Sequence, residues 1–298
     1  MNTLVDNQNS TGRNNIIWLA SYPKSGNTWF RIFLSNLLSE KEEDEDINSL
    51  YSTPIASCRN MFDESLNVES SDLTNDEIDL MRPEFYRDIS AEIPEGEKSY
   101  HKIHDAFTKN LNGEWIFPPE TACGAVYFIR NPLDVAVSAS VHNGCTIEQS
   151  VKNLNNIKFS IASNKKSLPD QIRQLLLSWS EHVRSWINAP LPVCVLRYED
   201  MKLDSFNTFK KAVEFMKLDK TDTEIRDAIE KSSFDKLQKQ EKEKGFKERS
   251  KKAKAFFRKG EIGDWRNHLT EEQVEKLINS HAEVMEQFGY LKDGQSFF

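Results

Sequence analysis

The chain has 298 residues, of which 38% are hydrophobic and 29% are charged, and its formal net charge is −8. A chain of this size and composition can bury a sizeable core as one soluble domain, and it contains no apolar run long enough to span a membrane. The net negative charge argues against nucleic-acid binding over the whole surface. Its four cysteines are widely spaced without a Cys-x-x-Cys pair, which indicates reduced thiols and a cytoplasmic protein.

The first predicted elements follow a polar N-terminus. Residues 1–15 have no apolar core or cleavage pattern, so we expect a disordered tail followed by a single domain over residues 16–298. The short apolar run at residues 16–20 predicts a buried strand. Apolar residues three and four positions apart between residues 30 and 38 then predict an amphipathic helix.

Residues 22–29, between this strand and this helix, read Tyr-Pro-Lys-Ser-Gly-Asn-Thr-Trp. A helix N-terminus attracts a phosphate or sulfate, Gly26 permits close approach of the backbone, and Lys24 adds a mobile positive charge. The hydroxyls of Ser25 and Thr28 are further donors. The loop is not a Walker motif, because its lysine precedes the glycine. A plain turn with a surface lysine would also fit this stretch taken alone.

The rest of the chain alternates strand and helix signals. Strands are predicted at residues 125–129 and 193–196, and amphipathic helices over residues 172–187, 206–216 and 274–288. Residues 40–100 are expected to form irregular helices. This alternation predicts an α/β fold, with a mainly parallel central sheet flanked by helices and ligands bound beyond the C-terminal ends of its strands.

Two segments have strongly biased charge. Residues 41–46 are almost wholly acidic and are interpreted as a solvated loop. Residues 236–259 are rich in lysine and arginine. A solvated helix could carry this basic stretch, but its position just before Arg258-Lys259-Gly260 favours a mobile segment that closes over an anionic ligand.

Three segments together resemble one enzyme family. The sequence of residues 22–29 resembles the 5′-phosphosulfate loop of the sulfotransferases that use 3′-phosphoadenosine 5′-phosphosulfate (PAPS). Residues 130–138, Arg-Asn-Pro-Leu-Asp-Val-Ala-Val-Ser, resemble the family's 3′-phosphate element. Residues 258–265, Arg-Lys-Gly-Glu-Ile-Gly-Asp-Trp, resemble its late signature. The resemblance implies a PAPS-dependent sulfotransferase of the soluble, cytosolic type, with a P-loop-like phosphosulfate-binding loop.

The resemblance also implies which residues contact the cofactor. The 5′-phosphosulfate would be held by the loop residues Lys24, Ser25, Gly26, Asn27 and Thr28. The 3′-phosphate would be held by Arg130, Ser138, Arg258, Lys259 and Gly260, since arginine grips a phosphate with two parallel hydrogen bonds. The adenine would contact Trp29, Tyr198, Ser232, Phe234 and Phe257, although aromatic residues also commonly serve only as core.

The proposed catalytic base comes from the segment Tyr100-His101-Lys102-Ile103-His104, which resembles the family's Lys-x-His sequence. The match assigns proton abstraction from the acceptor to His104 and places Lys102 and Lys24 at the transferring group. A surface histidine, or a metal held by His101 and His104, would be alternatives. We predict no metal, because no further histidine or cysteine cluster completes a ligand set. The other histidines are interpreted as structural or surface residues.

The expected reaction is transfer of a sulfuryl group to a hydroxyl or amine of a small molecule, and specialised metabolites are candidate acceptors. A nucleotide-dependent kinase of related fold is the alternative, but it would need a Walker loop and magnesium carboxylates. A catalytically inert nucleotide-binding scaffold is a third possibility, against which Lys24 and His104 argue. No membrane or nucleic-acid partner is expected. The family's Lys-Thr-Val-Glu dimerisation signature is absent from residues 266–276, which leaves the oligomeric state open.

Overall fold

The computed structural model describes residues 14–41, 43–163, 168–292 and 294–296. Most of the predicted tail therefore lies outside the described residues. Asn15, its last residue, is buried, and its side-chain amide donates a hydrogen bond to the carbonyl of Ser90 (3.0 Å). The ordered domain thus already includes Asn15. Within the described ranges, no helix is both long and apolar enough to cross a bilayer.

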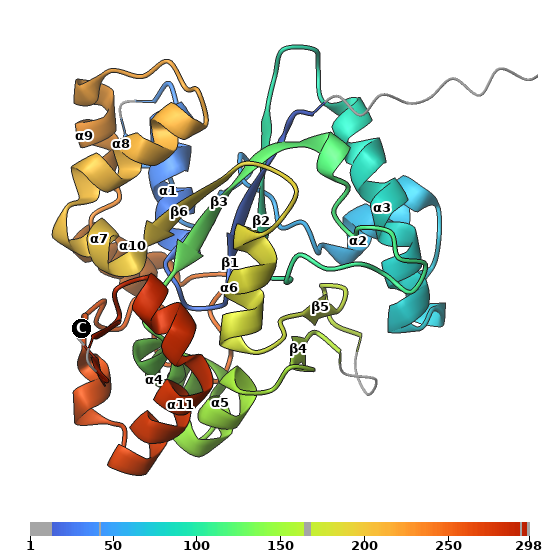
Figure 1. The fold of residues 1–298 in the computed structure, drawn as a ribbon. Helices are drawn as coiled ribbons and strands as arrows, with labels where there is room; N and C mark the ends of the chain where they lie inside the picture. The colour runs from blue at the N-terminus through green and yellow to red at the C-terminus, as the bar shows by residue number, and fades with distance from the viewer. Residues whose placement is uncertain (1–13, 42, 164–167, 293, 297–298) are drawn as a thin grey trace, which may run out of the picture.

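The centre of the fold is a four-stranded parallel sheet (Figure 1). Its strands are β1 (Ile16–Ser21), β2 (Ser99–Ile103), β3 (Ala122–Ile129) and β6 (Val193–Arg197), in the order β2-β1-β3-β6. All three pairings are parallel. The prediction of a mainly parallel α/β sheet is confirmed. Because the strands run the same way, β1, β2 and β3 bring their C-terminal ends to one edge of the sheet.

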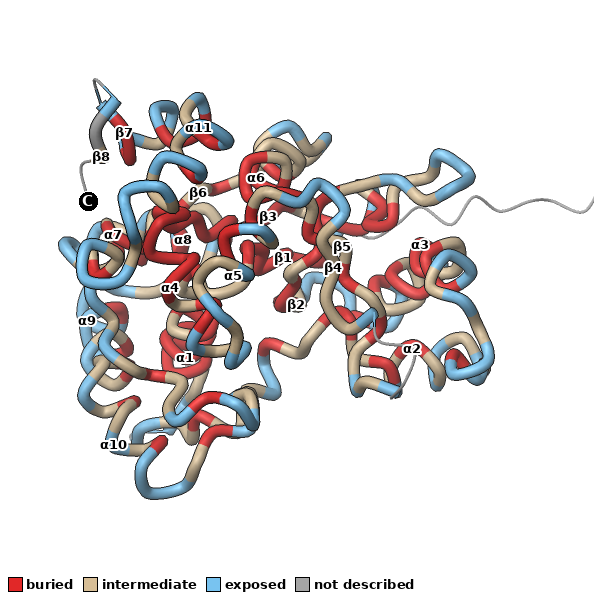
Figure 2. Tube along the Cα trace, turned by 90° about the horizontal axis from the view of Figure 1, so that it is seen from below, coloured by how far each residue is buried: buried red, intermediate tan, exposed pale blue. Residues whose placement is uncertain are grey.

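Helices cover both faces of this sheet, as Figure 1 shows. Side chains alternate along β1, so that Trp18 faces one hydrophobic cluster and Leu19 the other. Helices α1 (Asn27–Leu38), α8 (Ser205–Phe215) and α9 (Asp222–Lys231) pack on the Leu19 face. Helices α3 (Asn75–Glu92), α4 (Pro132–Asn143), α6 (Trp179–Ile187) and α11 (Glu271–Gln287) pack on the Trp18 face. The buried residues concentrate in these central elements (Figure 2).

The remaining elements are short or peripheral. The helices are α2 (Arg59–Leu66), α5 (Ile147–Leu154), α7 (Tyr198–Leu203) and α10 (Phe234–Lys244), and the 3-10 turns are η1 (Ser70–Asp72), η2 (Pro119–Thr121) and η3 (Asp264–Asn267). Two small antiparallel pairs complete the set: β4 (Ser160–Ile161) with β5 (Gln174–Leu175), and β7 (Leu291–Lys292) with β8 (Gln295–Ser296).

The predicted long helix over residues 172–187 is wrong in its first half, since only α6 is helical. Leu177 has φ +61°, a left-handed conformation that interrupts a helix, and the Ser178 side chain caps α6 by accepting from the Glu181 N–H. The preceding residues instead pair as β5 with β4. Strand β2 was missed altogether, because its polar sequence, Ser-Tyr-His-Lys-Ile, lacks the apolar run that marks the other strands.

The described residues of the acidic stretch, 41 and 43–46, lie in an exposed or half-buried loop, as predicted, and two of their carboxylates form surface ion pairs. Asp44 and Asp46 pair with Lys236 (3.3 Å) and Lys244 (3.1 Å) of α10. Beyond α10, the chain continues as an irregular segment, residues 245–263, which we call the strap. Phe246 at its start packs with Ile32, Ile47, Leu237 and Phe257 in a small hydrophobic cluster. The acidic run therefore docks the basic helix that leads into the strap.

Buried histidines should make the fold sensitive to acid. Burial lowers the pKa of His101, His182 and His281 to about 4 each. An unfolded histidine has a pKa near 6.5, so between pH 6.5 and pH 4 the unfolded chain binds more protons, and folding stability falls as pH falls. We expect a loss of about 1.4 kcal/mol per pH unit for each histidine. Urea unfolding between pH 7 and pH 5 measures this, and His281→Gln should reduce the slope by one histidine's share. An unchanged slope in that variant would contradict the assignment.

Candidate functional site

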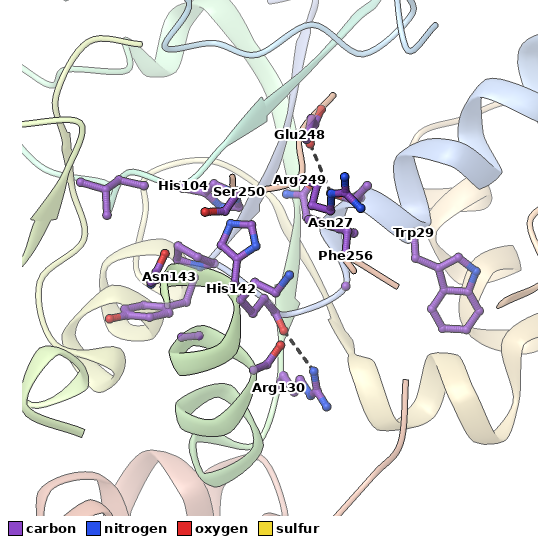
Figure 3. A pocket seen from close by; sticks show the side chains of 18 of the residues that line it. Asn27, Trp29, His104, Arg130, His142, Asn143, Glu248, Arg249, Ser250 and Phe256 are labelled. Carbon is purple, nitrogen blue, oxygen red and sulfur yellow. Dashed lines mark hydrogen bonds between the residues drawn. The ribbon is translucent and has the colours of Figure 1, made fainter. Parts of the chain in front are cut away.

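A cavity of about 760 Å³ lies at the C-terminal edge of the sheet. Several separate parts of the chain surround it (Figure 3). Asn27 and Trp29 come from the start of α1, His142 and Asn143 from the end of α4, and Glu248 and Phe256 from the strap. The cavity thus joins the loop after β1, the element after β3 and the late segment. This is the location expected for ligands in a parallel α/β sheet.

The loop between β1 and α1 needs its glycine. Gly26 has φ +100°, and a Cβ there would lie 2.9 Å from Cδ2 of Tyr198. Lys24 also adopts a left-handed φ of 73°. The Asn27 amide donates to the Leu19 carbonyl (2.7 Å), which ties the helix start to β1. The Ser25 hydroxyl is buried and finds no hydrogen-bond partner among the described residues, although Ser25 is not one of the residues that line the cavity.

The Lys24 ammonium lies in a strongly positive part of the cavity. Its Nζ stands 3.8 Å from the centre of the Phe256 ring. Burial, together with the neighbouring charges of Arg130 and Lys102, lowers the pKa of Lys24 to about 7. An anion bound beside these three cations would favour the protonated lysine. The loop geometry therefore suits an anionic group more than a neutral one.

The structure brings the predicted 3′-phosphate residues to this cavity, which Arg130, Ser138, Arg258, Lys259 and Gly260 all line. Asn131 caps α4 by accepting from the Leu133 N–H, with Pro132 in the first turn. The Asp134 carboxylate accepts from the backbone N–H groups of Gly263 (2.8 Å) and Trp265 (3.0 Å). It thereby fixes the late turn against the start of α4. Asp264 forms ion pairs with Arg258 (2.6 Å) and Lys259 (2.8 Å).

Four of the five predicted adenine residues line the same cavity, namely Trp29, Tyr198, Phe234 and Phe257. The fifth, Ser232, does not. Its hydroxyl donates to the Ala228 carbonyl within its own helix (2.8 Å), and its own carbonyl accepts from the Trp29 indole (2.9 Å). Ser232 therefore orients Trp29 from behind the cavity wall.

His104 directly follows β2, and one of its ring nitrogens is hydrogen-bonded to the backbone. Its Nδ1 is 2.9 Å from the Ser21 carbonyl, and because a carbonyl only accepts, Nδ1 carries the hydrogen. The Nε2 lone pair is then available to take a proton. Burial, together with the charge of Lys102, holds the pKa of His104 well below its usual value, so that the ring is neutral. The His104 carbonyl accepts from His182 Nε2 (3.0 Å), which steadies the turn.

The two histidines of the segment 100–104, His101 and His104, lie in different surroundings. His101 packs against Trp18 in the core and bonds the Ser99 hydroxyl (2.7 Å), away from the cavity. Lys102, the next residue, lines the cavity with His104. His142, interpreted from the sequence as structural or surface, also lines the cavity, so that interpretation is corrected. Two further charged residues were missed, Glu248 in the cavity wall and its partner Arg31.

The family profile described as "Sulfotransferase domain" matches residues 14–289. The chain belongs to the sulfotransferase family. Flavonol 3-sulfotransferase of Flaveria bidentis is 26% identical over 291 residues, which cover 92% of this chain and 83% of that protein. Cytosolic sulfotransferase 17 of Arabidopsis thaliana is 24% identical, covering 94% and 77%. A crystal structure of retinol dehydratase in complex with retinol and PAP shares the fold, with a TM-score of 0.58, 20% identity and coverage of 96% and 84%.

Part of the cavity wall in this sulfotransferase is apolar. It includes Ile55, Met61, Leu154, Phe159, Ile161 and Leu176. These residues come from α2, α5, the β4–β5 pair and the irregular segments beside them, which are distant in sequence. His104 and His142 lie in the same cavity. An apolar wall with a few polar groups is typical of a small-molecule site.

Proposed function

We propose that this sulfotransferase uses PAPS and transfers its sulfuryl group to a hydroxyl or amine of a small molecule. The observation that carries the proposal is the convergence of the 22–29 loop, Arg130 and the 258–260 turn on one cavity with His104. The residues fit an anionic nucleotide, because Lys24, Lys102 and Arg130 bring positive charge to the cavity and the buried Ser25 hydroxyl of the 22–29 loop has no partner in the described structure. Retinol dehydratase, of the same fold, was crystallised with PAP, the product of PAPS.

The cofactor, when bound, supplies a sulfuryl group on its 5′-phosphate. The α1 N-terminus and the hydroxyls of Ser25 and Thr28 would hold that phosphate, and Lys24 would offset the charge that develops on the leaving phosphate oxygen. Lys102 would offset charge on the transferring group. His104 Nε2 would take the acceptor's proton, and the Ser21 carbonyl would stabilise the resulting imidazolium through Nδ1–H. The relative named cytosolic supports a cytoplasmic location.

The first test is cofactor choice. We expect adenosine 3′,5′-bisphosphate (PAP) to bind at least tenfold, or about 1.4 kcal/mol, more tightly than AMP, because Arg130, Arg258 and Lys259 address the 3′-phosphate. Isothermal titration calorimetry without magnesium measures both affinities. Equal affinities for the two nucleotides would refute the 3′-phosphate assignment.

Isothermal titration calorimetry also tests the alternative of a nucleotide-dependent kinase. ATP should bind more weakly than PAP, and magnesium should not be required, because the loop lacks the Walker order of glycine and lysine. Preferential, magnesium-dependent binding of ATP would favour the kinase. This comparison needs no knowledge of the acceptor.

The basic stretch 236–259 should become protected when PAP binds. Its residues Phe257 and Arg258 line the cavity, so a ligand there gives the strap new partners. Hydrogen exchange with and without PAP measures the change, and helix α11, which packs on the sheet, is the internal reference. Equal protection of the stretch in both states would instead favour the alternative, in which residues 236–259 are a solvated surface.

A further inference from the structure

A carboxylate from the strap enters the positive part of the cavity. The two carboxylate oxygens of Glu248 lie 2.6 Å from Nη1 of Arg31 and 2.8 Å from Nζ of Lys102. The Thr28 hydroxyl is 3.5 Å from the same oxygen as Lys102. The Glu248 side chain thus contacts Thr28 in the 22–29 loop, Arg31 of helix α1 and Lys102, which lies two positions before His104.

Arg31 is held in place by burial and by hydrogen bonds. Its side chain is 2% exposed, and its other nitrogens donate to the Thr53 hydroxyl (3.1 Å) and carbonyl (2.7 Å). A buried guanidinium without a carboxylate partner would be costly, so Glu248 is held in place by Arg31. The two ion pairs hold the pKa of the Glu248 carboxyl well below its usual value.

The backbone around Glu248 is anchored on both sides of the contact. Phe246 is buried in the small cluster with Ile47 and Leu237, and the Lys247 N–H donates to the side chain of Asn48 (2.7 Å). Further along, the Glu241 carboxylate accepts from the N–H groups of Phe256 (2.7 Å) and Phe257 (2.9 Å). The carboxylate therefore comes from a fixed part of the strap.

We propose that Glu248 is a positioning residue, which holds the Lys102 ammonium protonated and fixed beside the 22–29 loop and the proposed base, His104. This inference rests on the proposed function, since it assigns Lys102 to the transferring sulfuryl group. Lys102 is buried, and burial disfavours its charged form. Among the described residues, the other groups whose charges couple to Lys102, namely Lys24, Arg31, His104 and His142, supply no negative charge. Glu248 therefore opposes the loss of the Lys102 proton.

The test uses the full chain labelled with [ε-¹³C]lysine, with the Lys102 signal assigned from its loss in Lys102→Arg. In Glu248→Gln, the titration midpoint of Lys102 should fall by about one pH unit or more. Glu248→Asp keeps the charge and should restore most of the shift. Glu243→Gln removes an exposed carboxylate from α10 and should leave Lys102 unchanged. An unaltered Lys102 midpoint in folded Glu248→Gln would overturn the proposal.

A different role for Glu248, as a side chain that PAPS displaces when it binds, predicts a different result in the same variants. If Glu248 merely occupied the place of the incoming sulfuryl group, Glu248→Gln would bind PAPS about tenfold more tightly, and that outcome overturns the positioning role. Positioning predicts a PAPS affinity within about threefold of the wild type. Should Glu248→Gln not fold, Glu248→Asp decides: its shorter side chain holds the charge farther from Lys102, so the Lys102 midpoint should fall by a part of the expected shift, and an unaltered midpoint would overturn the proposal. Wild-type protein that binds no PAP would instead refute the proposed function.

Discussion

Replacing His104 by alanine is expected to lower turnover by about 100-fold or more while leaving the affinity for PAP nearly unchanged. The ring is held by the Ser21 carbonyl with Nε2 free, and it lines the cavity between Lys102 and the apolar wall. Turnover would be measured with PAPS and the best acceptor from a panel of alcohols, phenols and amines. PAP binding would be measured by calorimetry.

His101→Gln is the matched control, because His101 lies directly before the Lys-x-His sequence and its side chain is buried in the core. Glutamine can keep the hydrogen bond to Ser99, so turnover per folded molecule should stay near the wild-type value. A strongly acidic phenol needs the base less and should show a smaller effect in His104→Ala than an alcohol does. Normal turnover in His104→Ala with loss of turnover in His101→Gln would show that the base is wrongly placed.

The sequence predicted those parts of the site that lie within short motifs. Lys24 stands beside a proline, Arg130 follows a strand end, and Gly260 is itself a glycine, so that local sequence already limits the backbone at each position. The structure adds why such positions are restrictive: a Cβ at Gly260 would lie 2.7 Å from the Phe234 ring. Central strands with apolar runs were predicted for the same local reason.

The rest of the site depends on contacts between distant segments. Glu248 stands in a run of charged residues, and nothing in that run distinguishes it from Glu243; only the fold brings it to Arg31, 217 positions away in the chain. Ser232 matched a family position, yet its hydroxyl bonds its own helix. The apolar wall is assembled from short elements between α2 and β5, whose packing determines the cavity's shape. The acceptor therefore could not be read from local patterns.

Replacing Lys24 by methionine should affect both donor binding and turnover. Methionine keeps most of the side chain's length and its packing against Phe256 but removes the charge. Because this lysine would offset charge on the departing phosphate, turnover should fall by about 100-fold, and PAP affinity by about tenfold. Lys276→Met, which removes only the surface pairs with Glu148 and Glu272, should change neither quantity.

Proton uptake gives the sharper measurement for Lys24. Its pKa of about 7 means that most of this lysine is neutral at pH 8 in the free protein, and a bound phosphate should raise that pKa. PAP binding at pH 8 should then take up about one proton, and PAP affinity should fall as pH rises from the pKa of Lys24 in the free protein, about 7, to its higher pKa in the complex. Calorimetry in buffers of different ionisation enthalpy counts the protons. Lys24→Met should abolish the uptake, whereas equal uptake by this variant and the wild type would mean that another group titrates and that Lys24 does not contact the phosphate.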